Sequence, residues 1–207
     1  AFKDYSPGLG FLESPWVGLK HFKDFFASSE CFRLIYNTLK INLAALCFGF
    51  PAPIVLAILI NEMGNGKFKR FTQTVSYMPH FISLVVICGL VKNFVSADGI
   101  ISSIVAVFSG EEANLLTIKE WFVPIYVGSN IWQDVGWGSI IYLAALSAID
   151  ECLYESAQLD GAGRINQIIH ITLPGIAPTI ITLLIIRVGS LLTVGFEKII
   201  LLYNELI

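Results

Sequence analysis

Four long apolar segments dominate the sequence, at residues 34–60, 74–95, 122–149 and 173–196. Each exceeds the roughly 20 apolar residues that a helix needs to cross a bilayer. An open sheet cannot cross lipid, because its unpaired backbone groups would find no hydrogen-bonding partner there, and these segments are far longer than a barrel strand. Only 14% of the residues are charged. We therefore predict an all-α, polytopic transmembrane helical bundle with about four spans.

Prolines in these segments predict where the helices are irregular. Pro51 and Pro53 in the first segment and Pro79 in the second should kink or break their helices, because proline lacks an amide hydrogen and clashes with the preceding turn. Pro174 and Pro178 are expected at the start of the fourth helix, where a missing amide hydrogen is tolerated.

The charges in the connecting loops indicate which side of the membrane each loop faces. The loop at 61–73 has three basic residues and one acidic residue, whereas the loop at 96–121 has four acidic residues and one lysine. By the positive-inside rule, the first loop is cytoplasmic and the second is external. Counting the spans onward places the loop at 150–172 in the cytoplasm and both chain ends outside.

Residues 1–33 are expected to form an external lead-in to the first span. Apolar side chains with helical spacing predict an interfacial helix on the outer leaflet within it: Trp16, Leu19, Phe22, Phe25 and Phe26. Docking to an external receptor is an alternative role for this helix. Because the chain opens at Ala1 without a methionine and stops directly after an apolar stretch, we expect a fragment with spans missing at both ends.

Several functional classes are disfavoured by the sequence. The net charge of −3 argues against nucleic-acid binding, which normally shows as a basic face. The four cysteines and three histidines are scattered, so we predict no metal site and no catalytic set. The segment GNGKF at 64–68 superficially resembles a phosphate-binding loop, but its first glycine is misplaced and Phe68 stands where Ser or Thr must hold magnesium. We expect no catalysis and no cofactor bound by this chain.

The loop at 150–172 has the pattern of a rigid projection. Residues 151–159 combine helix-forming residues with an acidic first turn, which the helix dipole favours. Gly161 and Gly163 would end that helix, and isoleucines with amphipathic spacing then lead to Pro174. A short helix, a glycine turn and a second helix suit mechanical docking into a partner.

The same loop resembles the motif of binding-protein-dependent ABC importer permeases, which reads E-A-A, three residues, G, nine residues and I-x-L-P. Ser156 replaces the first alanine, and the chain matches the motif at Glu155, Ala157, Gly161, Ile171, Leu173 and Pro174. In that family the loop inserts into a cleft of the cytoplasmic ATPase and transmits its closure to the membrane helices. The resemblance implies these coupling residues: Glu155, Ser156, Ala157, Asp160, Gly161 and Ala162.

Two further stretches extend the resemblance over nearly the whole chain. Residues 18–22 are similar to the family's external lead-in, with His21 in place of Asn, and Asn37-Thr38 is similar to the opening of its first core helix. The pattern most resembles the carbohydrate-uptake permeases of the LplB-type polysaccharide or oligosaccharide group. It implies the type I ABC importer permease fold, with about four of six spans present and a truncated permease domain at 34–207.

The resemblance also implies a location and a set of partners. The protein would lie in the bacterial cytoplasmic membrane and form the translocation path for a sugar or oligosaccharide. ATP and magnesium would bind to a partner ATPase dimer. A second, unlike permease subunit, an extracellular or periplasmic substrate-binding protein and membrane lipid are the other implied partners. The sugar is not specified, and lipids or peptides remain alternative cargo.

Two charged residues lie within the predicted spans, where charges are costly and usually functional. At 1.5 Å per residue, Asp134 and Arg187 each lie about 21–22 Å from the cytoplasmic end of the helix, so we expect them at the same depth. Neighbours that share their helical faces would complete a substrate path: Asn130, Gln133, Trp137, Ser190, Leu191 and Val194. His80 is a further candidate for this path. A buried Asp134–Arg187 pair that joins two helices without meeting substrate is the alternative.

A gradient-driven secondary transporter is the main rival interpretation. Such a protein couples transport to an ion or proton through carboxylates inside the membrane, and Asp134 is the candidate coupling group. An intramembrane enzyme is disfavoured by the missing catalytic set. Dependence of transport on ATP separates the importer from its rival.

Overall fold

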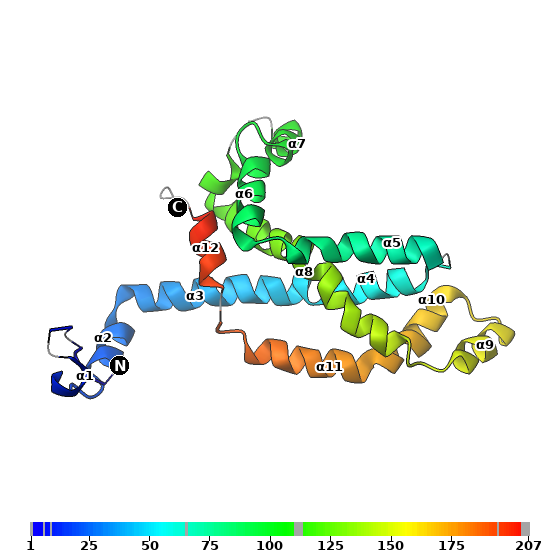
Figure 1. The fold of residues 1–207 in the computed structure, drawn as a ribbon, viewed down its shortest axis with the longest axis horizontal. Coiled ribbons are helices and arrows are strands. Elements are labelled where there is room, and N and C mark those ends of the chain that lie inside the picture. The colour runs from blue at the N-terminus through cyan, green and yellow to red at the C-terminus, as the bar shows by residue number, and fades with distance from the viewer. Residues whose placement is uncertain are drawn as a thin grey trace. The chain divides into compact units, whose positions relative to one another are not determined.

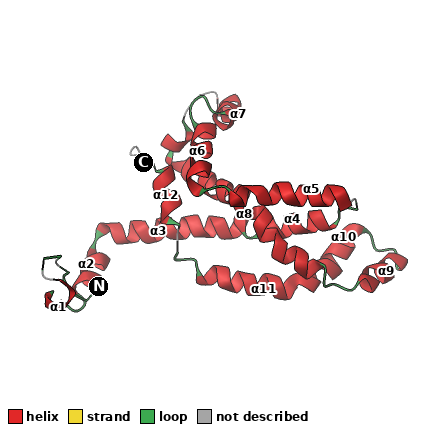
Figure 2. Cartoon of the chain, in the orientation of Figure 1, coloured by secondary structure: helices red, strands yellow, loops and turns green. Residues whose placement is uncertain are grey.

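The structure is a computed structural model that describes most of the chain, namely residues 2–5, 7–8, 10–64, 66–109, 114–193 and 195–203. Within this part, the regular structure is helical apart from one isolated antiparallel bridge between Lys3 and Trp16 (Figure 2). The all-α prediction is therefore confirmed. The chain divides into two compact units, Ala1–Lys40 and Ile41–Ile207.

The first unit contains α1 (Gly10–Glu13), α2 (Lys20–Ala27) and the beginning of α3 (Ser29–Ala44). The predicted amphipathic helix is present as α2, but it begins four residues later than expected. Trp16 forms the bridge instead, and Gly18, with a φ of 58°, turns the chain before the helix begins. The aromatic side chains of α2 are exposed. Its position at the outer leaflet stays a prediction.

A π-helical turn carries the first long helix through two prolines. The π-helix η1 (Ala45–Gly49) follows α3 and leads into α4 (Pro51–Asn61), so that a helix of 32 residues runs over Glu30–Asn61. The break considered at Pro51 and Pro53 does not occur. In a regular α-helix, the residue at each of these positions would donate a hydrogen bond to the carbonyl four residues earlier, which proline cannot do. Those two carbonyls lie in the π turn, where the hydrogen-bond pattern is already shifted.

Pro79 does interrupt the second apolar segment, as predicted. In place of one helix, the segment contains three elements: α5 (Gly66–Tyr77), the 3-10 turn η2 (Met78–Phe81) and α6 (Leu84–Val95). The stretch that is long and apolar enough to cross a membrane is Leu84–Val107, which extends into α7 (Ile100–Ser109). The predicted bounds of 74–95 are therefore wrong, and much of the predicted loop at 61–73 is helical.

The remaining elements are η3 (Leu115–Thr117), α8 (Lys119–Leu146), α9 (Glu151–Leu159), α10 (Arg164–Gln167), the π-helix η4 (Ile168–Thr172), α11 (Leu173–Gly189) and α12 (Phe196–Leu202). α8 corresponds to the third predicted span and bends by 74° into α9. The fourth span is displaced toward the N-terminus, to Arg164–Gly189. Pro174 therefore lies inside a continuous helix, where η4 accommodates it as η1 accommodates Pro51.

Three helices are long and apolar enough to cross a membrane, or four when the bent pair of α8 and α9 counts as one span. α8 is the central helix of the second unit and contacts α4, α5 and α11 (Figure 1). One buried cluster joins α4, α8 and α11: Ile54, Ala57, Ile60, Tyr142, Leu143, Leu146 and Ile176. Another buried cluster joins the end of α3 and η1 to α6, α8 and α12: Ile41, Ala45, Ile87, Cys88, Val91, Tyr126, Val127 and Leu202. The part of α8 between these clusters faces a cavity.

Candidate functional site

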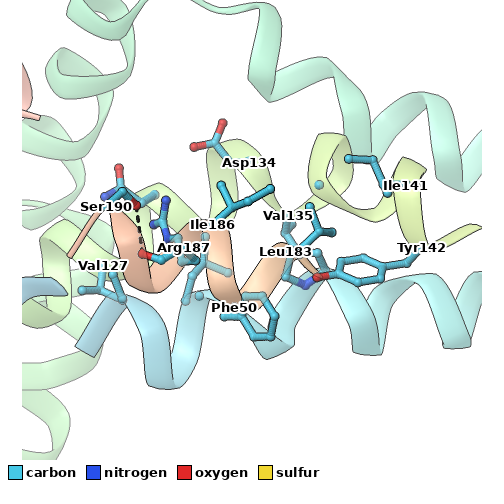
Figure 3. Close-up of a pocket in the computed structure, with 16 residues that line it drawn as sticks. Phe50, Val127, Asp134, Val135, Ile141, Tyr142, Leu183, Ile186, Arg187 and Ser190 are labelled. Carbon is cyan, nitrogen blue, oxygen red and sulfur yellow. Dashed lines mark hydrogen bonds between the residues drawn. The ribbon is translucent and has the colours of Figure 1, made fainter. Parts of the chain in front are cut away.

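A cavity of about 350 Å³ lies between α4, α8 and α11. Its lining is mostly apolar, but four polar side chains enter it from α8 and α11: Asn130, Asp134, Arg187 and Ser190. Figure 3 shows Arg187 and Ser190 at one end of this cavity and Ile141 and Tyr142 at the other. The Arg187 and Ser190 side chains therefore lie at one end of a mostly apolar chamber.

A second cavity of about 240 Å³ continues from that polar end. It shares Asn130, Asp134, Arg187 and Ser190 with the first cavity and adds Leu191, among others. Five of the predicted path residues thus line one or both of two adjoining cavities. The equal depth of Asp134 and Arg187 in the membrane stays a prediction. Gln133 lines neither cavity, and Val194 lies outside the described residues.

Asp134 is paired with His80 rather than with Arg187. The His80 Nδ1 atom lies 2.9 Å from Asp134 Oδ1, and the Asp134 side chain is 58% exposed. The His80 ring stacks on Trp137 with ring centroids 4.7 Å apart, and neither ring lines the two cavities. Arg187 forms no ion pair in the described part of the chain. The alternative of a buried Asp134–Arg187 pair is therefore not what the structure contains.

Lys198 is a residue of the site that the sequence analysis did not single out. Its side chain is 4% exposed, its Nζ donates to Asn130 Oδ1 at 2.6 Å, and the Tyr126 ring centroid lies 5.8 Å away. Burial lowers the pKa of Lys198, because it penalises the charged form. The sequence signal for this residue is a lysine within the apolar run FEKIILL. The sequence does not indicate its hydrogen-bond partner, because Asn130 is 68 residues away.

The predicted cytoplasmic loop folds as the expected helix, turn and helix. Asp150 caps α9 by accepting from the Cys152 amide at 3.0 Å, which lowers the pKa of the Asp150 carboxyl. Gly161 ends the helix with a φ of 79°, in the left-handed region that favours glycine. The coupling residues Glu155, Ser156, Asp160 and Gly161 are exposed, while Ala157 and Ala162 are half-buried. Leu159, at the tip, is 90% exposed.

Two hydrogen bonds brace α9 and the glycine turn against the helix of α10 and η4 that continues into α11. The Tyr154 hydroxyl lies 3.0 Å from Thr172 Oγ1, and Thr172 is buried. The Gln167 amide donates to the Ala162 carbonyl at 2.9 Å, which ties the glycine turn to α10. α9 is therefore connected through side chains to the helix whose far end carries Arg187.

Comparison with known proteins identifies the class. Residues 49–195 match the family described as binding-protein-dependent transport system inner membrane component, and the chain belongs to this family. Two relatives from Bacillus subtilis (strain 168) are 47% identical to it. Protein LplB aligns over 100% of this chain and 65% of its own length, and the polygalacturonan/rhamnogalacturonan transport system permease protein YteP over 99% and 64%. The chain thus spans slightly less than two thirds of the length of these relatives.

Solved structures agree with this assignment. A chain of a bacterial ABC transporter that imports the acidic polysaccharide alginate is 48% identical, with a TM-score of 0.87 over 93% of this chain and 68% of that chain. The same type of transporter in complex with a periplasmic protein bound to alginate pentasaccharide gives a TM-score of 0.86 at 48% identity, over 91% of this chain and 66% of that chain. The predicted resemblance and the ABC importer permease fold are therefore confirmed.

Proposed function

We propose that the protein is the permease subunit of an ATP-driven importer and forms the translocation path for an oligosaccharide. The observation that carries this proposal is the connection between the exposed loop and the cavity. α9 is braced through Tyr154 to Thr172 at the base of α11, and Arg187 enters the cavity 15 residues further along the same helix, about 22 Å away.

This connection accounts for how a partner could move the path. A partner ATPase dimer that closes around the coupling residues from Glu155 to Ala162 would displace α9. Because the Tyr154 hydroxyl of α9 is hydrogen-bonded to Thr172, directly before α11, the displacement would tilt α11. That tilt would change the opening of the cavity, as alternating access requires. The second permease subunit would supply the other half of the path, and an external binding protein would deliver the cargo. The relatives named for polygalacturonan/rhamnogalacturonan and alginate transport support a polysaccharide-derived cargo.

The test uses the full-length protein assembled with its candidate partners in vesicles. A photo-crosslinking residue placed at Asp160 should capture the ATPase subunit, and the same residue placed at Lys92, in α6, should not. Oligosaccharide uptake should require ATP. Uptake that continues in ATP-depleted vesicles under an ion gradient, with no ATPase captured from Asp160, would refute the proposal and favour a secondary transporter.

A further inference from the structure

A third cavity lies on another face of α8, and its lining residues differ from those of the two cavities described above. Its volume is about 390 Å³, and α6, α7 and η3 form the wall opposite α8. The lining residues of α8 follow the spacing i, i+3, i+4, i+7, i+8 and i+11: Trp121, Pro124, Ile125, Gly128, Ser129 and Trp132. This spacing places them on one stripe of the helix, so the cavity is a groove that runs along α8. We call it the α6–α8 groove.

The length of the α6–α8 groove matches the depth of one membrane leaflet. α8 has 28 residues and is therefore about 42 Å long, which is close to the full thickness of a bilayer with its headgroups. Trp121 lies about 3 Å from the end of α8 that is predicted to be external, and Trp132 lies about 20 Å from it. The groove between them is about 16 Å long, roughly half of the hydrocarbon core. It therefore extends from the membrane interface, where tryptophan is favoured, to the midplane.

The chemistry of the groove suits a hydrocarbon ligand rather than water. Most of its lining side chains are apolar, and the Ser129 hydroxyl already donates to the Tyr126 carbonyl at 2.9 Å. Water needs two or more polar partners to occupy a cavity, and an apolar cavity stays dry or binds an apolar molecule. A Cβ atom on Gly128, halfway along the stripe, would meet nothing within 4 Å. The open space is therefore continuous past the middle of the groove.

The width of the groove separates a single hydrocarbon chain from a helix of a partner protein. The volume and the length together give a cross-section of about 24 Å². A helix with its side chains is about 10–12 Å across and needs a cross-section of about 80–110 Å². Carbon atoms in contact lie about 3.5–4.0 Å apart, so one extended chain of methylene groups fits where a helix does not.

The groove is also continuous with the surface that faces lipid. Leu84–Val107 is long and apolar enough to cross a membrane, and Phe94 and Ile101 of this stretch line the groove and are both 41% exposed. Trp132 is 45% exposed on the opposite wall. We propose that the α6–α8 groove binds one acyl chain of a phospholipid from the leaflet on the predicted external side. This lipid site goes beyond the proposed function, because it takes a membrane component and not the cargo.

The experiment uses the full-length importer in vesicles of palmitoyl-oleoyl phosphatidylcholine that contain a small fraction of phosphatidylcholine with a diazirine in one acyl chain. After irradiation, mass spectrometry measures the labelled fraction of each peptide. The α8 stripe should be labelled in the wild type. Gly128→Leu fills the middle of the groove and should lower labelling of the stripe about fivefold to a hundredfold, the range that overpacking corresponds to.

Gly89→Leu is the matched control. Gly89 is an exposed glycine of α6 whose Cβ atom would also meet nothing within 4 Å, and it lies outside the groove lining. This variant should leave labelling of the stripe unchanged. ATP-dependent uptake by both variants shows that they are folded and assembled. An unlabelled stripe in the wild type, or equal labelling in Gly128→Leu, would overturn the inference.

A second measurement tests whether a protein occupies the groove instead. The photo-crosslinking residue p-benzoylphenylalanine, placed at Trp132 of the full-length importer, should gain the mass of one phospholipid after irradiation. A cross-link to the second permease subunit or to another segment of this chain, without a lipid adduct, would refute the lipid site. Because these readouts follow lipid and not cargo, that failure would leave the proposed function untouched.

Discussion

The contact between α8 and α5 depends on a single glycine and yields a quantitative prediction. A Cβ atom on Gly136 would lie 1.9 Å from the backbone oxygen of Ser76 and 2.3 Å from its carbonyl carbon. Carbon and oxygen need about 3.3 Å, so Gly136→Ala must separate the two helices by about 1.4 Å. Overpacking of this kind costs about 1–3 kcal/mol. At about 2–4 °C per kcal/mol for a chain of this size, Tm should fall by roughly 2–12 °C.

Two other glycines of the same helix provide matched controls in the full-length protein. A Cβ on Gly128 would meet nothing within 4 Å, so Gly128→Ala should leave Tm unchanged or slightly raised. A Cβ on Gly138 would lie 3.1 Å from the Pro53 ring, so the two helices need to separate by only a few tenths of an ångström, and Gly138→Ala should have an intermediate effect. Thermal unfolding of the three variants measures the order. If Gly136→Ala were as stable as Gly128→Ala, the close packing of α8 on α5 would be refuted.

Three further predictions concern the coupling loop and the buried lysine. Gly161→Ala forces a Cβ into a φ of 79° and should destabilise the turn by about 1–2 kcal/mol, lowering uptake per ATP hydrolysed. Gly163→Ser, at an ordinary φ of −69°, should not do so, and equal defects would contradict the role of the turn. Tyr154→Phe removes only the hydroxyl that meets Thr172, so ATP hydrolysis should persist while uptake falls, and unchanged uptake would exclude this brace. Because the pKa of Lys198 is lowered from its ordinary value of 10.5, the unfolded chain binds more protons, and Tm should rise with pH between the lowered value and 10.5. This rise should disappear in Lys198→Met, and its persistence there would assign it to another group.

The class of the protein was determined by local sequence properties. Hydropathy alone indicated an all-α membrane protein, because a backbone that crosses lipid must satisfy its own hydrogen bonds, and a helix of this length does so. The spacing from Glu155 to Pro174 indicated the family, which the comparison with known proteins confirms. Distances counted along two helices predict a common depth for Asp134 and Arg187. Each of these inferences uses only the chemistry of neighbouring residues and the fixed rise of a helix, so no knowledge of the packing was needed.

The tertiary structure decided the partners of each polar group. The sequence allowed Asp134 to pair with Arg187, but the break at Pro79 presents His80 to it instead, across 54 residues of sequence. Lys198 lies in α12, which packs on α6, and its side chain meets Asn130 of α8. Pairing between distant segments follows from which helix faces meet, and hydropathy and spacing contain no measure of that.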